Sequence, residues 1–189
     1  MRKIKSLVAV MLVIPFLLIG CGTPWQAKTT AGYISATTLA GTAENSAKPS
    51  CDVGAIPADK CAKLKEIYGN IRQGLVSAGD TAILAFSVTD AVTQKTLLAQ
   101  FDSLMQEVQA NIKQYIELYQ DLSKTYGRKA LPKNAISPEL LTILINVFTA
   151  IVQNIPNIIQ AIDSWNINAV DIPGLTAQIQ TAQANLPVW

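Results

Sequence analysis

The sequence predicts an all-α protein, a bundle of four or five helices that includes one long helix with a heptad pattern. Apolar residues recur every three or four positions over residues 64–86 and 101–126, which is the spacing of one helix face. Residues that start or stop helices flank these segments: prolines at 57 and 138, and a glycine at 127. No segment alternates apolar and polar residues long enough to predict a strand.

Small side chains dominate the first part of the chain. Thr, Ser, Ala and Gly make up 18 of the 29 residues from 22 to 50. This composition fits a flexible tether that reaches roughly 30 Å, or a helix of small residues. The residues with helical spacing are Trp25, Thr29, Gly32, Ala36, Ala40, Ala43 and Ala47. We therefore favour a helix over residues 25–47, and expect three regions: a leader over 1–20, a tether or first helix over 21–50, and a bundle over 51–189.

A second helix is predicted from Pro57 onward. Proline is tolerated at the first helical position, and the carboxylate of Asp59 suits the positive end of the helix dipole. The buried stripe is expected to comprise Leu64, Ile67, Tyr68, Ile71, Leu75, Ala78, Ala82 and Phe86. The three glycines of this segment, Gly69, Gly74 and Gly79, each weaken a helix by up to ~1 kcal/mol, so close packing against a neighbour is a plausible reason for them. Helix-capping residues follow: Ser87, Thr89 and Asp90.

The clearest helix is predicted over residues 90–126. Its heptad seam consists of Phe101, Met105, Val108, Ile112, Tyr115, Tyr119, Leu122 and Tyr126. Gly127 fits a C-cap, with Arg128 and Lys129 near the negative end of the dipole. We expect the three tyrosines to pack in the core; stacking on a sugar ring is the alternative.

An uncharged helix is predicted to follow Ser137-Pro138-Glu139, which is a strong start signal. Residues 140–162 are long enough to cross a bilayer. However, polar residues form one stripe along this helix: Thr142, Asn146, Thr149, Gln153, Asn157 and Gln160. A bundle helix with one wet edge fits this stripe better, and membrane association is the alternative. Pro156 should kink the helix or restart it, and a last helix is expected over residues 173–185.

The N-terminus has the organisation of a secretory signal. Arg2, Lys3 and Lys5 precede the apolar run 7–19, which leads to Leu18-Ile19-Gly20-Cys21. This tetrad resembles the lipobox of bacterial lipoproteins. The resemblance implies that residues 1–20 are cleaved as a signal peptide and that Cys21 is lipidated, with acyl chains such as palmitate. In many Gram-negative lipoproteins an aspartate directly after the lipidated cysteine retains the protein in the inner membrane. This chain has Gly22 at that position, so the resemblance implies the outer membrane if the host is Gram-negative.

The remaining cysteines, Cys51 and Cys61, form an even pair in an oxidising compartment. A disulfide between them would close a loop of about ten residues and contribute on the order of 2–3 kcal/mol. Two free thiols are the alternative. A redox role is less expected, because the spacing is not Cys-x-x-Cys.

Composition argues against several functions. There is no histidine, which excludes His-dependent catalysis and most zinc and haem sites. Lys+Arg total 15 and Asp+Glu 13, so no basic field favours nucleic acid. Without the three basic residues of the signal, 12 basic and 13 acidic residues remain, a net charge of −1. We expect no catalytic residue, metal or cofactor.

Two groups of charged residues could form sites. Glu117 and Asp121 share a helix face, as paired carboxylates of glycosidases can, but solvated charges are the simpler interpretation. Arg128, Lys129 and Lys133 could contact lipid phosphates or an acidic partner, although capping of a helix end explains the first two equally well.

These observations predict a lipid-anchored, non-enzymatic protein of the cell envelope, facing the periplasm if the host is Gram-negative. It would be a structural or adaptor component that presents helical packing faces to an envelope protein partner, with the membrane as its other partner through Cys21. One alternative is a helical module that binds a small ligand or lipid in its core. A second is a membrane-linking or membrane-perturbing protein. In outline the chain resembles single-chain spanins of phages, which join a lipobox to a C-terminal transmembrane segment, but it departs from them in the many Asn and Gln residues of 140–162 and in its uncharged tail.

Overall fold

The structure is a computed structural model that describes residues 24–126, 137–161 and 170–189. Within these residues the chain forms five helices and no strand, which confirms the predicted all-α bundle. The helices are α2 (Trp25–Asp52), α3 (Ala58–Ser87), α4 (Ala91–Tyr126), α5 (Pro138–Ala161) and α6 (Ile172–Ala184). The lipobox with Cys21, the expected cap at Gly127 and the cations Arg128, Lys129 and Lys133 lie outside the described residues.

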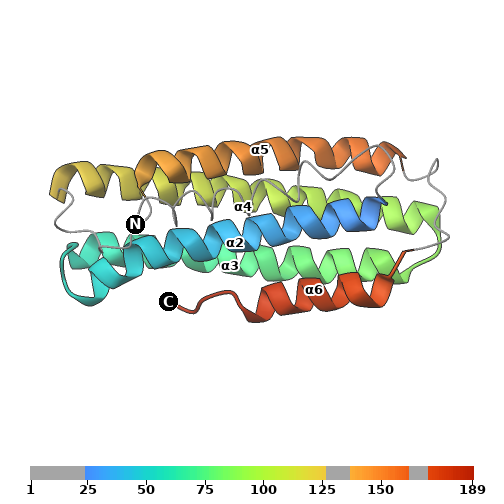
Figure 1. The fold of residues 1–189 in the computed structure, drawn as a ribbon, viewed down its shortest axis with the longest axis horizontal. Helices are drawn as coiled ribbons and strands as arrows, with labels where there is room; N and C mark the ends of the chain where they lie inside the picture. The colour runs from blue at the N-terminus through green and yellow to red at the C-terminus, as the bar shows by residue number, and fades with distance from the viewer. Residues whose placement is uncertain (1–23, 127–136, 162–169) are drawn as a thin grey trace, which may run out of the picture.

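Helices α2 to α5 run side by side along the long axis of the molecule, each reversing the direction of the one before (Figure 1). Helix α6 lies alongside α2 and α3. The most extensive packing is between α3 and α4, followed by α4 with α5. The described part of the chain is therefore an up-and-down bundle with a short fifth helix added to one flank.

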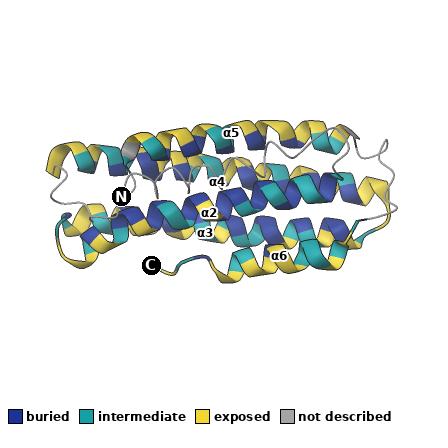
Figure 2. Cartoon of the chain, viewed as in Figure 1, coloured by how far each residue is buried: buried dark blue, intermediate teal, exposed yellow. Residues whose placement is uncertain are grey.

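Helix α2 lies at the centre of the packing, because it contacts each of the other four described helices. More than half of its residues are buried (Figure 2), and only one strip of the helix, which includes Ile34, Thr38, Gly41, Thr42 and Asn45, is partly or fully exposed. The region from residue 25 to 52 is a helix and not a tether. The buried alanines of α2, which have no exposed area, are Ala36, Ala40, Ala43 and Ala47.

Small side chains explain how neighbours approach α2 so closely. A Cβ atom placed on Gly32 would lie 3.0 Å from Ile151 Cγ2 of α5. Several buried hydroxyls of α2 are satisfied inside the helix: Ser35 donates to the Ala31 carbonyl at 2.9 Å, and Ser46 to that of Thr42 at 2.8 Å. Such back-bonding lets serine and threonine be buried without a partner on another helix. Those of Thr30 and Ser50 have no hydrogen-bond partner among the described residues.

The seam of α4 is buried as its heptad pattern predicts. Phe101, Met105 and the following apolar positions through Leu122 are at most 4% exposed, whereas Tyr126, at the end of the helix, is 41% exposed. The predicted stripe of α3, from Leu64 to Phe86, is buried as well. Asp90 accepts a hydrogen bond from the Thr93 amide at 2.7 Å, which caps the start of α4.

The uncharged helix α5 is amphipathic in this structure. It buries Leu141, Leu144, Ile145, Phe148, Ile151, Val152 and Ile155. The predicted polar stripe lies on the outer side, with only Thr149 half-buried. Among the described helices, only the segment Glu139–Gln160 is long and apolar enough to span a membrane. In this structure its apolar face is turned into the bundle.

The expectation that the helix restarts at Pro156 is wrong, since α5 continues through it to Ala161. Pro156 lies on the exposed side of the helix. There the ring points to solvent, and water can satisfy the carbonyl that loses its helical donor. The last helix, α6, begins one residue earlier than expected, with the Asp171 side chain accepting from the Gly174 amide at 3.0 Å.

The glycines of α3 provide a matched test of close packing. A Cβ on Gly79 would lie 2.8 Å from the Tyr33 hydroxyl and 2.6 Å from Gln183 Nε2, whereas a Cβ on Gly69 would meet nothing within 4 Å. We expect Gly79→Ala to lower the free energy of unfolding by about 1–3 kcal/mol through overpacking. Gly69→Ala should raise it by up to about 1 kcal/mol, because alanine favours the helix. Chemical denaturation measures both, and equal shifts for the two variants would contradict the packing explanation.

Candidate functional site

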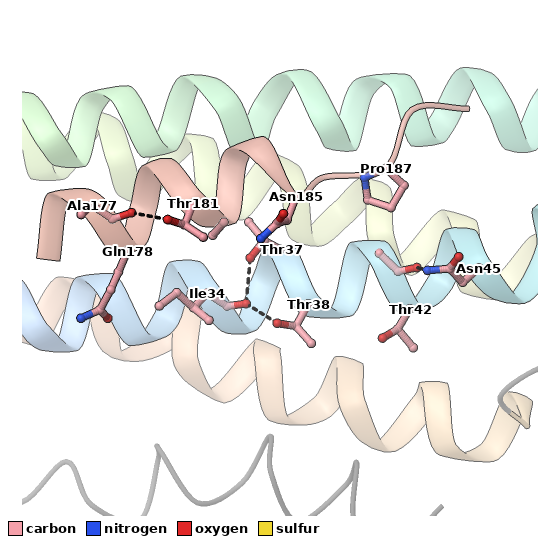
Figure 3. A pocket seen from close by; sticks show the side chains of 12 residues that line it. Ile34, Thr37, Thr38, Thr42, Asn45, Ala177, Gln178, Thr181, Asn185 and Pro187 are labelled. Atoms are coloured by element: carbon pink, nitrogen blue, oxygen red, sulfur yellow. Dashed lines mark hydrogen bonds between the residues drawn. The ribbon is translucent and has the colours of Figure 1, made fainter. Parts of the chain in front are cut away.

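A groove of about 610 Å³ lies between α2 and α6 (Figure 3). Its floor is the outward side of α2, and its wall is α6 with the segment that follows it. The lining side chains are short and uncharged: Ile34, Thr37, Thr38, Gly41, Thr42, Asn45, Ala177, Gln178, Thr181, Ala182, Asn185 and Pro187. A groove with this lining has no group that could act as a general acid or base at neutral pH.

Most hydrogen-bond donors of the groove are already used within their own helices. Thr37 and Thr38 both donate to the Ile34 carbonyl, at 2.9 and 2.8 Å. Asn45 donates to the Gly41 carbonyl, and Thr181 to that of Ala177, both at 2.8 Å. The groove therefore presents methyl groups and hydroxyl oxygens, and an apolar surface can cover it without leaving these donors unpaired.

Pro187, after α6, closes one end of this groove. It lies close to Gly41, where an added Cβ would come within 3.6 Å of Pro187 Cδ. The Tyr68 hydroxyl donates to the Pro187 carbonyl at 3.1 Å. The ring of Trp189 then packs on Tyr68 and Tyr115, with centroid separations of 6.0 and 6.2 Å. The segment after α6 is thus fixed to the aromatic core by one hydrogen bond and two ring contacts.

A buried carboxyl group lies on another side of α2. Glu44 is only 2% exposed. Burial raises the pKa of its carboxyl group, Lys48 partly offsets this, and Asp52 adds to it. Glu44 also raises the pKa of Tyr68 and Tyr115, for which burial is the larger cause. Burial raises the pKa of Tyr119 to about 12. These tyrosines stay protonated at physiological pH, which makes them unsuited to act as bases.

Several buried polar atoms in this interior have no partner among the described residues. They include the hydroxyls of Tyr115 and Tyr119 and the Nε atom of Arg72. Bound water commonly satisfies such groups. A buried polar group without a partner costs stability.

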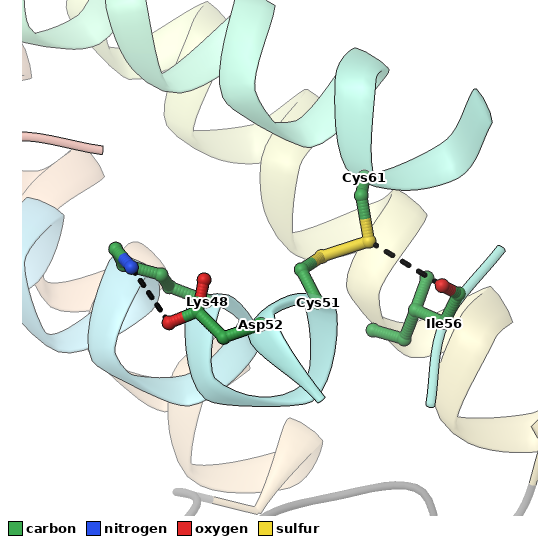
Figure 4. Close-up of a disulfide and its surroundings, with 5 residues drawn as sticks. All are labelled: Lys48, Cys51, Asp52, Ile56 and Cys61. Atoms are coloured by element: carbon green, nitrogen blue, oxygen red, sulfur yellow. Dashed lines mark hydrogen bonds and ion pairs between the residues drawn. A yellow bond between two sulfur atoms is a disulfide. The ribbon is translucent and has the colours of Figure 1, made fainter. Parts of the chain in front are cut away.

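The disulfide predicted from the cysteine count is present between Cys51 and Cys61, whose Cα atoms lie 5.7 Å apart (Figure 4). It joins the last turn of α2 to the first turn of α3. Gly54 in the intervening turn has a φ of 68°, a conformation that favours glycine. Lys48 pairs with Asp52 at 2.6 Å on the adjacent turn. The bridge staples a helical hairpin and is half-buried, which is the setting of a structural disulfide.

The other residues considered from sequence are scattered. Glu117 and Asp121 are both exposed on α4 and do not line either groove, so they are solvated charges in this fold. Tyr115 and Tyr119 are core residues. A smaller groove of about 330 Å³ runs between α3 and α4, lined by Asn70, Gln73, Gly74, Ser77, Leu104, Glu107, Val108 and Asn111. Among the described residues no group of three His, Cys, Asp or Glu side chains is arranged to hold a metal ion.

Sequence reasoning did not identify the α2–α6 groove or the buried position of Glu44. The threonines at 37, 38 and 42 carried a partial signal, because they interrupt the small-residue face of α2 on one side. The pairing of α6 with α2 could not be read from either segment alone.

No protein-family model, curated protein or solved structure matches the chain.

The interior carboxyl group allows a test of pH dependence. A raised pKa means that the folded protein holds the Glu44 proton more tightly than the unfolded chain does. The free energy of unfolding should therefore fall as pH rises from about 4.5, the ordinary value, through the raised pKa. Glu44→Gln should remove this fall and stabilise the protein at pH 7 by on the order of 1 kcal/mol. Denaturation at a series of pH values measures this.

Glu117→Gln is the control, since this carboxylate is exposed and surface changes alter stability by only about 0.5 kcal/mol. A Glu44→Gln protein that loses stability at pH 7 would show that Glu44 is stabilised as a carboxylate. One that keeps the wild-type pH profile would show that folding does not shift the pKa of Glu44.

Proposed function

We propose that this chain is a lipid-anchored, non-enzymatic protein of the cell envelope that acts as an adaptor, taking up a segment of a partner protein in the α2–α6 groove. The observation that carries the proposal is the chemistry of that groove: short, neutral side chains whose donors are mostly satisfied within their own helices.

A helical segment with small or apolar residues fits such a surface. Covering Thr38, Asn45 and Thr181 strands none of the donors that these side chains use internally. Small residues on α2 also permit close approach of a further helix, as Gly32 does for α5. Helix-in-groove recognition of this kind is a recurring mode of peptide binding.

The anchor rests on the lipobox resemblance at Cys21. Acyl chains stabilise membrane attachment by about 0.8 kcal/mol per buried methylene, and two or more anchor a protein stably. With the anchor in place, even a weak groove would be occupied by partners held on the same membrane, because tethering raises the effective concentration.

A small-ligand module is the second candidate. The groove volume of about 610 Å³ lies in the usual range for small-molecule sites. The amides of Gln178 and Asn185 make no side-chain hydrogen bond to another described residue, which leaves them available to orient a ligand.

Site-specific crosslinking distinguishes these functions. A photoreactive amino acid at position 38, in the groove, should give a protein-sized adduct in intact envelopes of the native host, whereas one at position 114, exposed on α4, should not. Gly41→Leu should reduce the adduct several-fold by filling the groove. An added Cβ at Gly41 makes only ordinary contacts, and circular dichroism checks that the variant with the whole leucine side chain keeps the fold. Adducts of small mass would favour the ligand module, and equal adducts at 38 and 114 would contradict a groove-specific partner.

Membrane extraction tests the anchor. The chain carrying Cys21→Ser, secreted behind an ordinary cleavable signal in place of residues 1–20, should fractionate with soluble protein, because α5 buries its apolar face in the bundle. The control Cys51→Ser/Cys61→Ser also replaces cysteines by serine, but it should stay in the membrane fraction with the mass of an acylated chain. Retention of the Cys21→Ser protein in the bilayer would favour insertion of α5 and the membrane-linking alternative.

A further inference from the structure

We propose that the bundle stands upright on the bilayer, with the end formed by the start of α2 and the α3–α4 connection in contact with lipid and with Val92 at the interface. This inference rests on the lipid anchor of the proposed function. It goes beyond that function in assigning a membrane-contacting surface to particular residues of the folded domain.

The first step is the position of the start of α2. Trp25, its first residue, is 1% exposed and packs edge-on against Phe86 near the end of α3, with ring centroids 5.4 Å apart. Gln94 in the first turn of α4 donates to the Val88 carbonyl at 2.6 Å. These contacts place the start of α2, the end of α3 and the start of α4 at one end of the bundle (Figure 1).

The second step is reach. Cys21 precedes Trp25 by four residues, and a fully extended chain advances at most about 3.6 Å per residue, so at most about 14 Å separates them. Helix α2, with 28 residues, is about 42 Å long. A domain that begins so soon after an acylated cysteine keeps this end next to the membrane, whereas a 29-residue tether would have allowed any orientation.

The third step is charge, which selects the upright orientation. Three ion pairs lie on the last turn of α2 or the first turns of α3, at the opposite end: Lys48–Asp52, Lys60–Asp59 and Lys63–Glu66. Large apolar side chains are exposed at both ends, Val92 (73%) and Leu84 (51%) near the anchor and Val53 (78%) and Ile143 (57%) at the far end, so they do not distinguish the ends. The end near the anchor carries fewer charged side chains. Charged groups are costly to bring against hydrocarbon, so the anchor end is the one suited to face lipid.

Exposed valines at the two ends supply a matched pair. Val92 is 73% exposed near the anchor, and Val53 is 78% exposed in the α2–α3 turn at the far end. They share their chemistry and exposure and differ in their distance from the start of α2. Position 114, midway along α4 and exposed, reports on a bundle that lies on its side.

The test uses the full acylated protein in vesicles of phosphatidylcholine and phosphatidylglycerol with a headgroup-level quencher lipid. A fluorescent amino acid is placed at 92, 53 or 114, with circular dichroism to confirm folding and intact-mass analysis to confirm acylation. Quenching at 92 should exceed quenching at 53 and 114 by at least about threefold.

Quenching at 114 or 53 that equals quenching at 92 in the acylated protein would overturn the upright orientation and leave the anchor intact. An intact mass without acyl chains would instead remove the anchor, and with it the basis of this inference.

Discussion

The bundle is organised around a helix that contributes very little side-chain volume of its own. Helix α2 packs against four neighbours because alanine, glycine, serine and threonine let other backbones approach closely. Burying so many hydroxyls would be costly if each needed a partner on another helix. Donation to carbonyls three or four residues earlier removes that cost for Ser35, Thr37 and Ser46. Side chains on the outward strip of α2 also donate to carbonyls of their own helix. An apolar surface can therefore cover the groove floor without leaving these donors unpaired.

This arrangement connects the two ends of the molecule. Helix α2 begins four residues after the proposed lipid attachment point, forms the floor of the groove along its middle, and ends at the disulfide that joins it to α3. An anchor, a recognition surface and a covalent staple thus lie on one rigid element about 42 Å long. A partner bound in the groove would be held at a defined height above the membrane, which a flexible tether could not achieve.

Much of the fold could be predicted from local sequence. The heptad seam of α4, the start of α3 after Pro57 and the start of α5 after Ser137 follow from periodicity and capping, which are properties of neighbouring residues. The groove could not be predicted, because it depends on α6 packing beside α2, more than 130 residues away in sequence. The restart expected at Pro156 did not occur for a related reason: the cost of a proline inside a helix depends on whether the residue faces solvent, which local sequence did not show. The burial of Glu44 could not be predicted either, since composition alone would place a glutamate at the surface.

Amide hydrogen exchange along α2 tests the central claim most directly. If α2 is the packed centre of the bundle, amides from Ala36 to Ala47 should exchange as slowly as those of the α4 seam from Met105 to Tyr115, close to the limit set by global unfolding. If these residues form a tether in solution, their amides should exchange orders of magnitude faster than the α4 seam. That result would contradict the central position of α2, and with it the groove and the upright orientation.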